Sequence, residues 1–260
     1  MTLVDRVISS LRTHHDRLAG LVPTLDEAAL TSPSGATEWR VCDVYSHLGS
    51  GAEISLRPVA AAAAGTPPPA AANEEIWDRW NALGPLDQAA GFVEHDQRLV
   101  ETLEALDGDA RESLQVDLGF LPAPVPLVVA AGMRLNEVVL HAWDVEVAFD
   151  PDAGLDPEAA GLLLDLLAGP LSFLLGFSAK PGALGATAAV DAGRFGLHVA
   201  PDAVEVLEAT PVAPTATFTG PHEALVRLLA GRLSPEHTPD GVAVTGEVSL
   251  DDLRLVFPGY

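Results

Sequence analysis

Two segments of the chain carry side chains whose types and spacing are those of metal ligands. Glu137 and His141 are four positions apart, which on an α-helix places both side chains on one face, one turn apart. His47 lies in a second helical stretch, from which its imidazole could reach the pair inside a bundle. Two histidines and one carboxylate leave one position of a tetrahedral ion open, as in catalytic zinc sites. We therefore predict that His47, Glu137 and His141 bind one divalent metal, zinc or another transition metal that accepts these ligands.

Each of these residues also has an explanation without a metal. A glutamate and a histidine at this spacing occur by chance in many helices. Glu137 can pair instead with Arg134, three residues before it. A lone histidine such as His47 is more often hydrogen-bonded in a core or exposed on a surface. The spacing alone therefore leaves both interpretations open.

Neighbouring polar residues could complete or orient the site. Asp43, four residues before His47, could be a fourth ligand or an acceptor for the imidazole N–H; alternatively, it interacts with the dipole at the start of its helix. Asp144, three residues after His141, is a similar acceptor. Cys42 is five positions from His47, about 140° around a helix, so we predict that it is neither ligand nor nucleophile. We expect solvated surface positions for the six other histidines: His14, His15, His95, His198, His222 and His237.

Helical periodicity in the first part of the chain predicts a bundle that would position these residues. Apolar residues recur at helical spacing, and prolines and glycines separate the segments. The proline run at 67–69 follows the helix that carries His47. Four principal helices connected in this way predict a helical bundle. The expected helices cover residues 2–21, 40–65, 74–81 with 86–107, and 127–149.

The rest of the chain has a different pattern. Residues 157–177 are expected to be helical, after which short alternating runs predict strands at 195–200, 203–209, 216–220 and 241–246. Helices are expected at 221–231 and 249–257. The acidic, proline-containing segment 150–156 separates the two patterns. The predicted fold class is therefore α+β, with a four-helix bundle over residues 1–152 and a small α+β domain over residues 153–260.

Composition excludes several classes of partner. Fourteen Lys and Arg stand against 37 Asp and Glu, a formal net charge of −23, which opposes binding to nucleic acid or to an anionic membrane. Cys42 is the single cysteine, so an intramolecular disulfide is impossible. The N-terminal segment lacks the uninterrupted apolar run of a signal peptide or membrane span. We therefore expect a cytoplasmic protein, monomeric or homodimeric, that acts on small molecules.

Two segments resemble the signature segments of a known family. They are TEWRVCDVYSHL at 37–48 and RLNEVVLHAWDVEVAF at 134–149, and they resemble the mycothiol-dependent maleylpyruvate isomerase family, within the broader DinB-like metal-binding superfamily. The matching residues are Trp39, Asp43, His47, Glu137, His141 and Asp144. Residues 216–234 and 241–259 resemble the small, sterol-carrier-protein-like C-terminal domain of the family. Arg40 departs from the pattern, because relatives commonly have a small helix-capping residue there, and loss of a cap costs about 1 kcal/mol.

The resemblance implies a zinc ion held by two histidines and one glutamate, with mycothiol as the thiol cosubstrate. A metal lowers the pKa of a bound thiol and so supplies the nucleophilic thiolate at neutral pH. That thiolate can add to an electrophilic small molecule, giving either cis-to-trans isomerisation or a stable S-conjugate. The implied function is therefore that of a mycothiol-dependent S-transferase or isomerase.

Arginines are the expected ligands for carboxylates of the thiol or the electrophile. Arg232 best matches an arginine of the C-terminal domain that faces the site in relatives; alternatively, it is a solvated residue after a helix that ends in glycine. Arg134 and Arg79 are further candidates for binding the cosubstrate. Two other functions stay open: a non-catalytic protein that binds an apolar ligand, and a metal hydrolase that uses metal-bound water.

Overall fold

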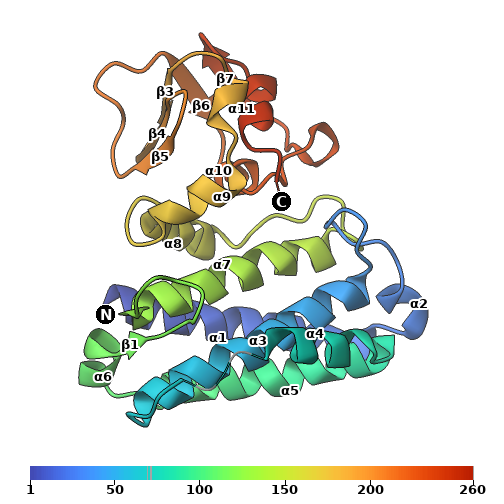
Figure 1. Cartoon of the computed structure of the whole chain (residues 1–260). Helices are drawn as coiled ribbons and strands as arrows, with labels where there is room; N and C mark the ends of the chain where they lie inside the picture. The colour runs from blue at the N-terminus through green and yellow to red at the C-terminus, as the bar shows by residue number, and fades with distance from the viewer. Residues whose placement is uncertain (69, 71, 260) are drawn as a thin grey trace. The chain divides into compact units, whose positions relative to one another are not determined.

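The computed structural model describes residues 1–68, 70 and 72–259, so Pro69 of the expected helix-ending proline run lies outside the described residues. The chain divides into two compact units, Met1–Asp150 and Pro151–Tyr260 (Figure 1). The first unit is mainly helical, and the second combines helices with a five-stranded sheet. The predicted α+β fold class, a helical bundle followed by a small α+β unit, is confirmed.

Four long helices form the first unit: α1 (Leu3–Leu21), α3 (Val41–Ala63), α5 (Pro85–Glu104) and α7 (Leu127–Glu146) (Figure 1). α1 and α3 each pack against both α5 and α7, which closes the bundle around a common core. The shorter α4 (Asn73–Asn81) packs on α3. These helices agree with the helices expected from periodicity.

Local sequence explains where the bundle helices begin. Thr2 and Asp5 form a reciprocal capping box at the start of α1, which satisfies backbone N–H groups that have no helical partner. Pro85 occupies the first turn of α5, where its missing N–H costs nothing. α3 continues through Pro58. α7 is buried along most of its length. It carries Glu137 and His141, two of the three residues of the site described below.

Short elements that periodicity did not predict complete the first unit. They are α2 (Glu27–Leu30), α6 (Gly108–Ser113), and the two-stranded antiparallel ladder of β1 (Gln115–Val116) and β2 (Val125–Pro126). Each is too short to show a hydrophobic period.

The second unit begins with α8 (Pro157–Leu167). Residues 157–177, expected to be helical, form several helical segments with a break: a turn follows Leu167, and the chain then forms η2 (Ser172–Leu174) and α9 (Leu175–Ser178). Pro170 explains the break, since it lacks an N–H and disfavours helical conformation in the residue before it.

The sheet of the second unit has the order β5-β4-β3-β6-β7. Its strands are β3 (Ala188–Ala192), β4 (Phe195–Val199), β5 (Val204–Leu207), β6 (Ala216–Thr219) and β7 (Ala243–Gly246). β3 pairs in parallel with β6, and the other pairs are antiparallel. The central strand, β3, was not predicted. α10 (His222–Leu229), η4 (Pro235–His237) and α11 (Leu250–Val256) complete this unit, together with the short η3 (Pro181–Ala183).

Within the described residues, no single helix has the length and hydropathy needed to cross a membrane; α8 taken together with the bent segment Ser172–Ser178 satisfies those two criteria only as a pair.

Candidate metal centre

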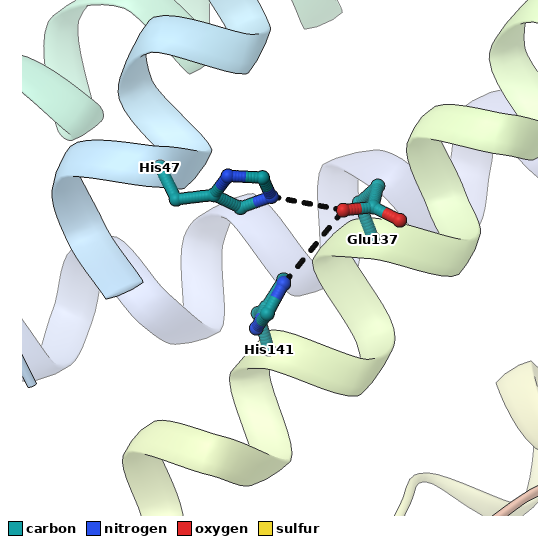
Figure 2. Close-up of side chains that lie close together, drawn as sticks. All are labelled: His47, Glu137 and His141. Carbon is teal, nitrogen blue, oxygen red and sulfur yellow. Dashed lines mark hydrogen bonds and ion pairs between the residues drawn. The ribbon is translucent and has the colours of Figure 1, made fainter. Parts of the chain in front are cut away.

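The structure brings together the three side chains that the sequence singled out. His47 comes from α3, and Glu137 and His141 come from adjacent turns of α7, which packs against α3 (Figure 2). One nitrogen of each imidazole and one carboxylate oxygen lie within 4.8 Å of one another. His47 Nε2 is 2.9 Å from Glu137 Oε2, and His141 Nε2 is 3.7 Å from the same oxygen.

These distances fit a single tetrahedral ion. Zinc binds imidazole nitrogen and carboxylate oxygen at about 2.0–2.2 Å, so neighbouring ligand atoms of a tetrahedral zinc ion lie about 3.3 Å apart. The separations of the three ligand atoms lie on both sides of that value. The His47 and Glu137 side chains are 36% and 41% exposed. Partial exposure leaves one side of the group open for a further ligand.

Asp144 orients the imidazole of His141. Its carboxylate Oδ2 lies 2.7 Å from His141 Nδ1, and the Asp144 side chain is fully buried. A proton on Nδ1, donated to this carboxylate, places the lone pair of the ring on Nε2, the atom that faces Glu137 and could bind a cation. The expectation that Asp144 is an acceptor for this imidazole is confirmed.

Asp43 acts at the start of its own helix, which is the second of the two roles expected for it. It accepts hydrogen bonds from the Arg40 backbone N–H at 2.9 Å and from Arg40 Nε and Nη2 at 2.8 and 2.7 Å. The hydrogen bonds from Arg40 hold the pKa of the Asp43 carboxyl below its ordinary value. Asp43 thus stabilises the first turn of α3 and is not part of the metal-ligand group. It also supplies the cap that Arg40 was expected to lack.

Cys42 is fully buried, and burial raises the pKa of its thiol. It lies outside the group of three, in agreement with its expected position on the helix.

The Glu137 carboxyl is held in its ionised form. Burial raises the pKa of this carboxyl, but the hydrogen bond with His47 and the charges of His141, His47 and Arg134 outweigh it and bring the pKa to about 2. An ionised carboxylate between two imidazoles is a negative site that attracts a divalent cation.

Trp39 lies against both imidazoles. Its ring is stacked on His141, with centroids 5.6 Å apart and planes 15° apart, and is tilted against His47 at 5.1 Å. The indole is 36% exposed, so it forms an aromatic wall on one side of the group. The resemblance had matched Trp39 to the family, but spacing gave no sign of this contact because Trp39 precedes the helix.

The loop before α3 is attached to α7 next to this wall. Gly35 N–H donates to the backbone carbonyl of Asp144 at 2.7 Å. A Cβ at Gly35 would lie 2.6 Å from Val147 Cγ1 and 3.0 Å from Asp144 Cα, so only glycine permits this approach. The Ser34 hydroxyl donates to the Trp39 carbonyl at 2.9 Å. The residue that orients His141 therefore also anchors the loop that carries Trp39.

Two of the three candidate arginines, Arg134 and Arg79, lie in the first unit, and each is paired with a carboxylate there. Arg134 is 5% exposed and bonded to Asp96 and to the Leu48 carbonyl in the bundle interior. This pairing opposes the expected contact between Arg134 and the thiol, which stays a prediction. Arg79 is half exposed and paired with Glu53 at 2.5 Å; its role in cosubstrate binding also stays a prediction.

Arg232 belongs to the second unit. It follows Gly231, whose φ of 69° ends the α10 helix in the left-handed region, and its Nη1 donates to the Ala230 carbonyl at 3.2 Å. This local setting fits the alternative in which Arg232 follows a glycine helix end. Its expected catalytic role stays a prediction.

Two of the six histidines expected to be solvated are buried. His14 and His15 are 2% and 3% exposed. His14 Nδ1 lies 2.8 Å from the Ser10 carbonyl, and His15 Nδ1 lies 2.9 Å from Asp96 Oδ2. The expectation was wrong for both because they lie between Leu11 and Leu18 at helical spacing and thus on the inner face of α1. That spacing is the signal that could have identified them.

The chain is similar to known proteins both in sequence and in fold. The family described as Mycothiol maleylpyruvate isomerase N-terminal domain matches residues 11–146. Two uncharacterized proteins of Mycobacterium tuberculosis strains, MT0763 and Rv0738, are each 30% identical over 145 residues, which cover 56% of this chain and 68% of each relative. Two crystal structures of the mycothiol-dependent maleylpyruvate isomerase, one of them a point mutant, each share 95% coverage of both chains. Their TM-scores are 0.63 and 0.62 at 20% and 21% identity, which shows a common fold.

Proposed function

The chain belongs to the mycothiol maleylpyruvate isomerase family through its N-terminal domain, and from this premise we propose that it is a metal-dependent enzyme that activates mycothiol for attack on a small electrophile. The observation that carries the proposal is the convergence of His47, Glu137 and His141 on one point of the bundle. Three ligands with one open side are what a thiol-activating centre requires.

A bound divalent cation would lower the pKa of a thiol that coordinates it, so that the nucleophilic thiolate is present at neutral pH. His47, Glu137 and His141 would hold this cation, and zinc suits two imidazoles and one carboxylate. Asp144 keeps His141 in the orientation that directs Nε2 towards the group. Glu137 contributes negative charge without having to lose a proton near neutral pH, since its pKa is about 2.

Trp39 would restrict the approach to the centre. Its indole covers the imidazoles of His47 and His141 on one side, and a flat apolar surface favours the conjugated part of an electrophile over bulk water. The thiol and the electrophile would then meet on the side that Trp39 leaves open.

The proposed reaction begins with addition of the thiolate to an electrophilic carbon of a conjugated double bond. A carbon–sulfur bond forms and the double bond becomes a single bond, about which the adduct can rotate. Expulsion of the thiolate restores the double bond in the trans form; protonation of the adduct instead gives a stable S-conjugate. Isomerase and S-transferase activity thus share the same first step.

The second unit is proposed to bind the polar end of a reactant. In this proposal residues 1–152 are the metal-binding bundle, and residues 153–260 are the sterol-carrier-like domain that supplies Arg232 to a carboxylate. Arg79 is a second proposed carboxylate ligand.

Metal analysis combined with a thiol-consumption assay tests the proposal. We expect one equivalent of zinc or a similar metal in the purified protein, and consumption or recycling of mycothiol with an electrophile panel that includes maleylpyruvate. His47→Ala should lose metal and turnover together, and glutathione should replace mycothiol poorly. Retained turnover in metal-free protein would contradict the proposal, and turnover without any thiol would indicate a hydrolase.

A further inference from the structure

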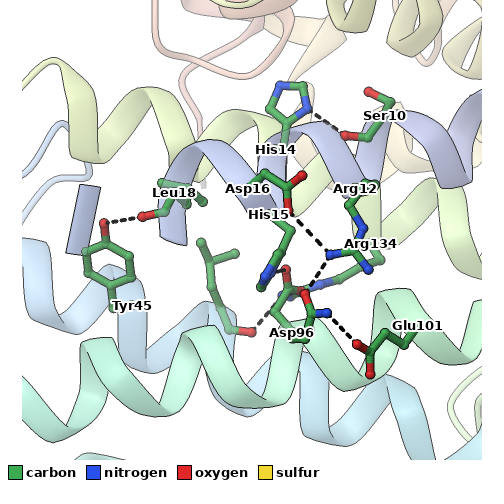
Figure 3. A network of polar contacts seen from close by, with 12 residues as sticks. Ser10, Arg12, His14, His15, Asp16, Leu18, Tyr45, Asp96, Glu101 and Arg134 are labelled. Atoms are coloured by element: carbon green, nitrogen blue, oxygen red, sulfur yellow. Dashed lines mark hydrogen bonds and ion pairs between the residues drawn. The ribbon is translucent and has the colours of Figure 1, made fainter. Parts of the chain in front are cut away.

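A buried polar network joins all four long helices of the bundle (Figure 3). Arg134 of α7 donates from Nη2 to Asp96 Oδ1 of α5 at 2.7 Å and to the Leu48 carbonyl of α3 at 2.8 Å. His15 Nδ1 of α1 lies 2.9 Å from the other Asp96 oxygen. Asp96, His15 and Arg134 are 1%, 3% and 5% exposed. These charged and polar groups are therefore part of the interior.

Residues of the network are close in sequence to the candidate metal ligands, both on α3 and on α7. Leu48 directly follows His47 on α3, and Arg134 is one turn before Glu137 on α7. One guanidinium thus links the α3 backbone beside the first ligand to the α7 turn beside the second. Gly51 leaves room for it, because a Cβ at that position would lie 3.0 Å from Arg134 Nη1.

Stability alone does not explain this arrangement. A buried ion pair is often no more stable than apolar side chains of similar volume, since desolvation offsets the attraction. Among the described residues, Arg134 Nε is a buried donor without a hydrogen-bond partner, which adds a further cost. The network can instead fix geometry, because one guanidinium nitrogen, Arg134 Nη2, donates both to Asp96 on α5 and to the Leu48 carbonyl on α3 and so holds α3, α5 and α7 in register.

We propose that Arg134, held by Asp96 and His15, is a positioning residue that sets the separation between His47 on α3 and the Glu137–His141 pair on α7. The inference rests on the proposed metal binding. It assigns Arg134 to the geometry of the metal centre in place of a contact with the thiol.

The test compares zinc affinity in three variants of the full chain. Arg134→Met keeps a similar volume and removes the guanidinium, Arg134→Lys keeps the charge but not the planar guanidinium that places Nη2 between Leu48 and Asp96, and Asp96→Asn removes the anionic partner of Arg134. Loss of a group that orients metal ligands lowers affinity about 10–100-fold. We expect a loss of this size for Arg134→Met and smaller losses for the other two. With cobalt in place of zinc, the visible absorption of Arg134→Met should also change, because the ligand geometry changes.

A matched control separates positioning from general destabilisation. Leu103→Ala removes a buried core side chain of α5 that is 1% exposed and should lower the unfolding temperature while leaving zinc affinity within about twofold of the wild type. At saturating zinc, the KM for mycothiol should be unchanged in Arg134→Lys. If Arg134→Met does not fold, Arg134→Lys, which keeps the buried charge paired with Asp96, carries the same comparison.

Two results would overturn the inference while leaving the proposed function intact. One is wild-type zinc affinity in all folded network variants; the other is a raised KM for mycothiol with unchanged zinc affinity, which would make Arg134 a thiol ligand. A wild-type protein that binds no divalent metal would overturn the proposed function and the inference together.

Discussion

Two of the clusters of histidine and carboxylate in the first unit differ in how far their side chains are exposed to solvent. In the candidate metal centre, His47 and Glu137 are 36% and 41% exposed. In the interior network, His15 and Asp96 are paired at a similar distance, but their side chains are only 4% and 1% exposed. Both clusters come from the same bundle helices.

The carboxylates of the two clusters, Asp96 and Glu137, differ in the groups that neutralise their negative charge. Asp96 is already paired with the guanidinium of Arg134: burial raises the pKa of Asp96, but the charges of Arg134 and the bond with His15 more than offset it. Glu137 faces two imidazoles, which can give up their protons to bind a metal. An arginine cannot do so. One cluster is therefore complete without a metal, and the other can accept one.

The largest expected effect on stability is in the interior network. Asp96→Asn should lower the free energy of unfolding by about 3–5 kcal/mol, because it leaves the buried Arg134 charge without its anionic partner. Glu94→Gln, two residues earlier on α5, breaks an exposed pair with Arg98 and should cost at most about 0.5 kcal/mol. Urea denaturation measures both. Equal effects of the two substitutions would show that burial does not distinguish these pairs.

Asp144→Asn should act on the metal centre. We expect zinc affinity to fall about 10–100-fold, because the carboxylate that orients His141 loses its charge. Asp16→Asn is a suitable control, since Asp16 is exposed and paired only weakly with Arg12 at 3.4 Å. Zinc titration by calorimetry gives both affinities, and unchanged binding in Asp144→Asn would argue against an orienting role.

The pH dependence of the free energy of unfolding should differ between the wild type and Glu137→Gln, in which an uncharged amide replaces the carboxylate. The folded pKa of Glu137, about 2, is below the ordinary value of 4.5, so in metal-free protein the ionised carboxylate stabilises the fold above pH 4.5. That contribution is lost as pH falls through the window from about 4.5 to 2. The advantage of wild type over Glu137→Gln should therefore shrink across this window, as measured by urea denaturation at each pH. A constant difference would contradict the lowered pKa.

The smallest expected effect is spectroscopic. Trp39 contacts both imidazoles of the centre, so binding of cobalt or nickel should quench part of the tryptophan fluorescence. Trp39→Phe should lose most of that quenching, whereas Trp77→Phe, at another exposed tryptophan, should keep it. Equal quenching in the two variants would place the metal away from Trp39.

The residues of the candidate metal centre could be anticipated from the sequence to different degrees. Helical spacing was enough to place Glu137 and His141 on one face of α7, because both belong to one regular element. Spacing could not show that α3 packs against α7; the predicted bundle made His47 a candidate third ligand, and the resemblance strengthened that prediction. Trp39 precedes α3, in a loop held by Gly35 and Asp144, and no periodic rule predicts such a contact.

The interior of the fold was harder to predict where tertiary contacts outweigh local preference. His15 was expected on the surface because no second ligand stands at helical spacing from it, although Asp96 makes its burial possible. β3 has the sequence AAVDA, which contains few residues that favour strands. It forms the central strand because β4 and β6 both pair with it, a cause that is not visible in its own sequence.

Zinc titration of the metal-free chain by calorimetry tests the central claim most directly. The account predicts binding of one equivalent per chain in the wild type, no measurable binding in Glu137→Gln, and restoration of mycothiol-dependent turnover only in the zinc-loaded wild type. Stoichiometric binding of zinc by Glu137→Gln with wild-type affinity would show that the metal is held elsewhere and would contradict the account.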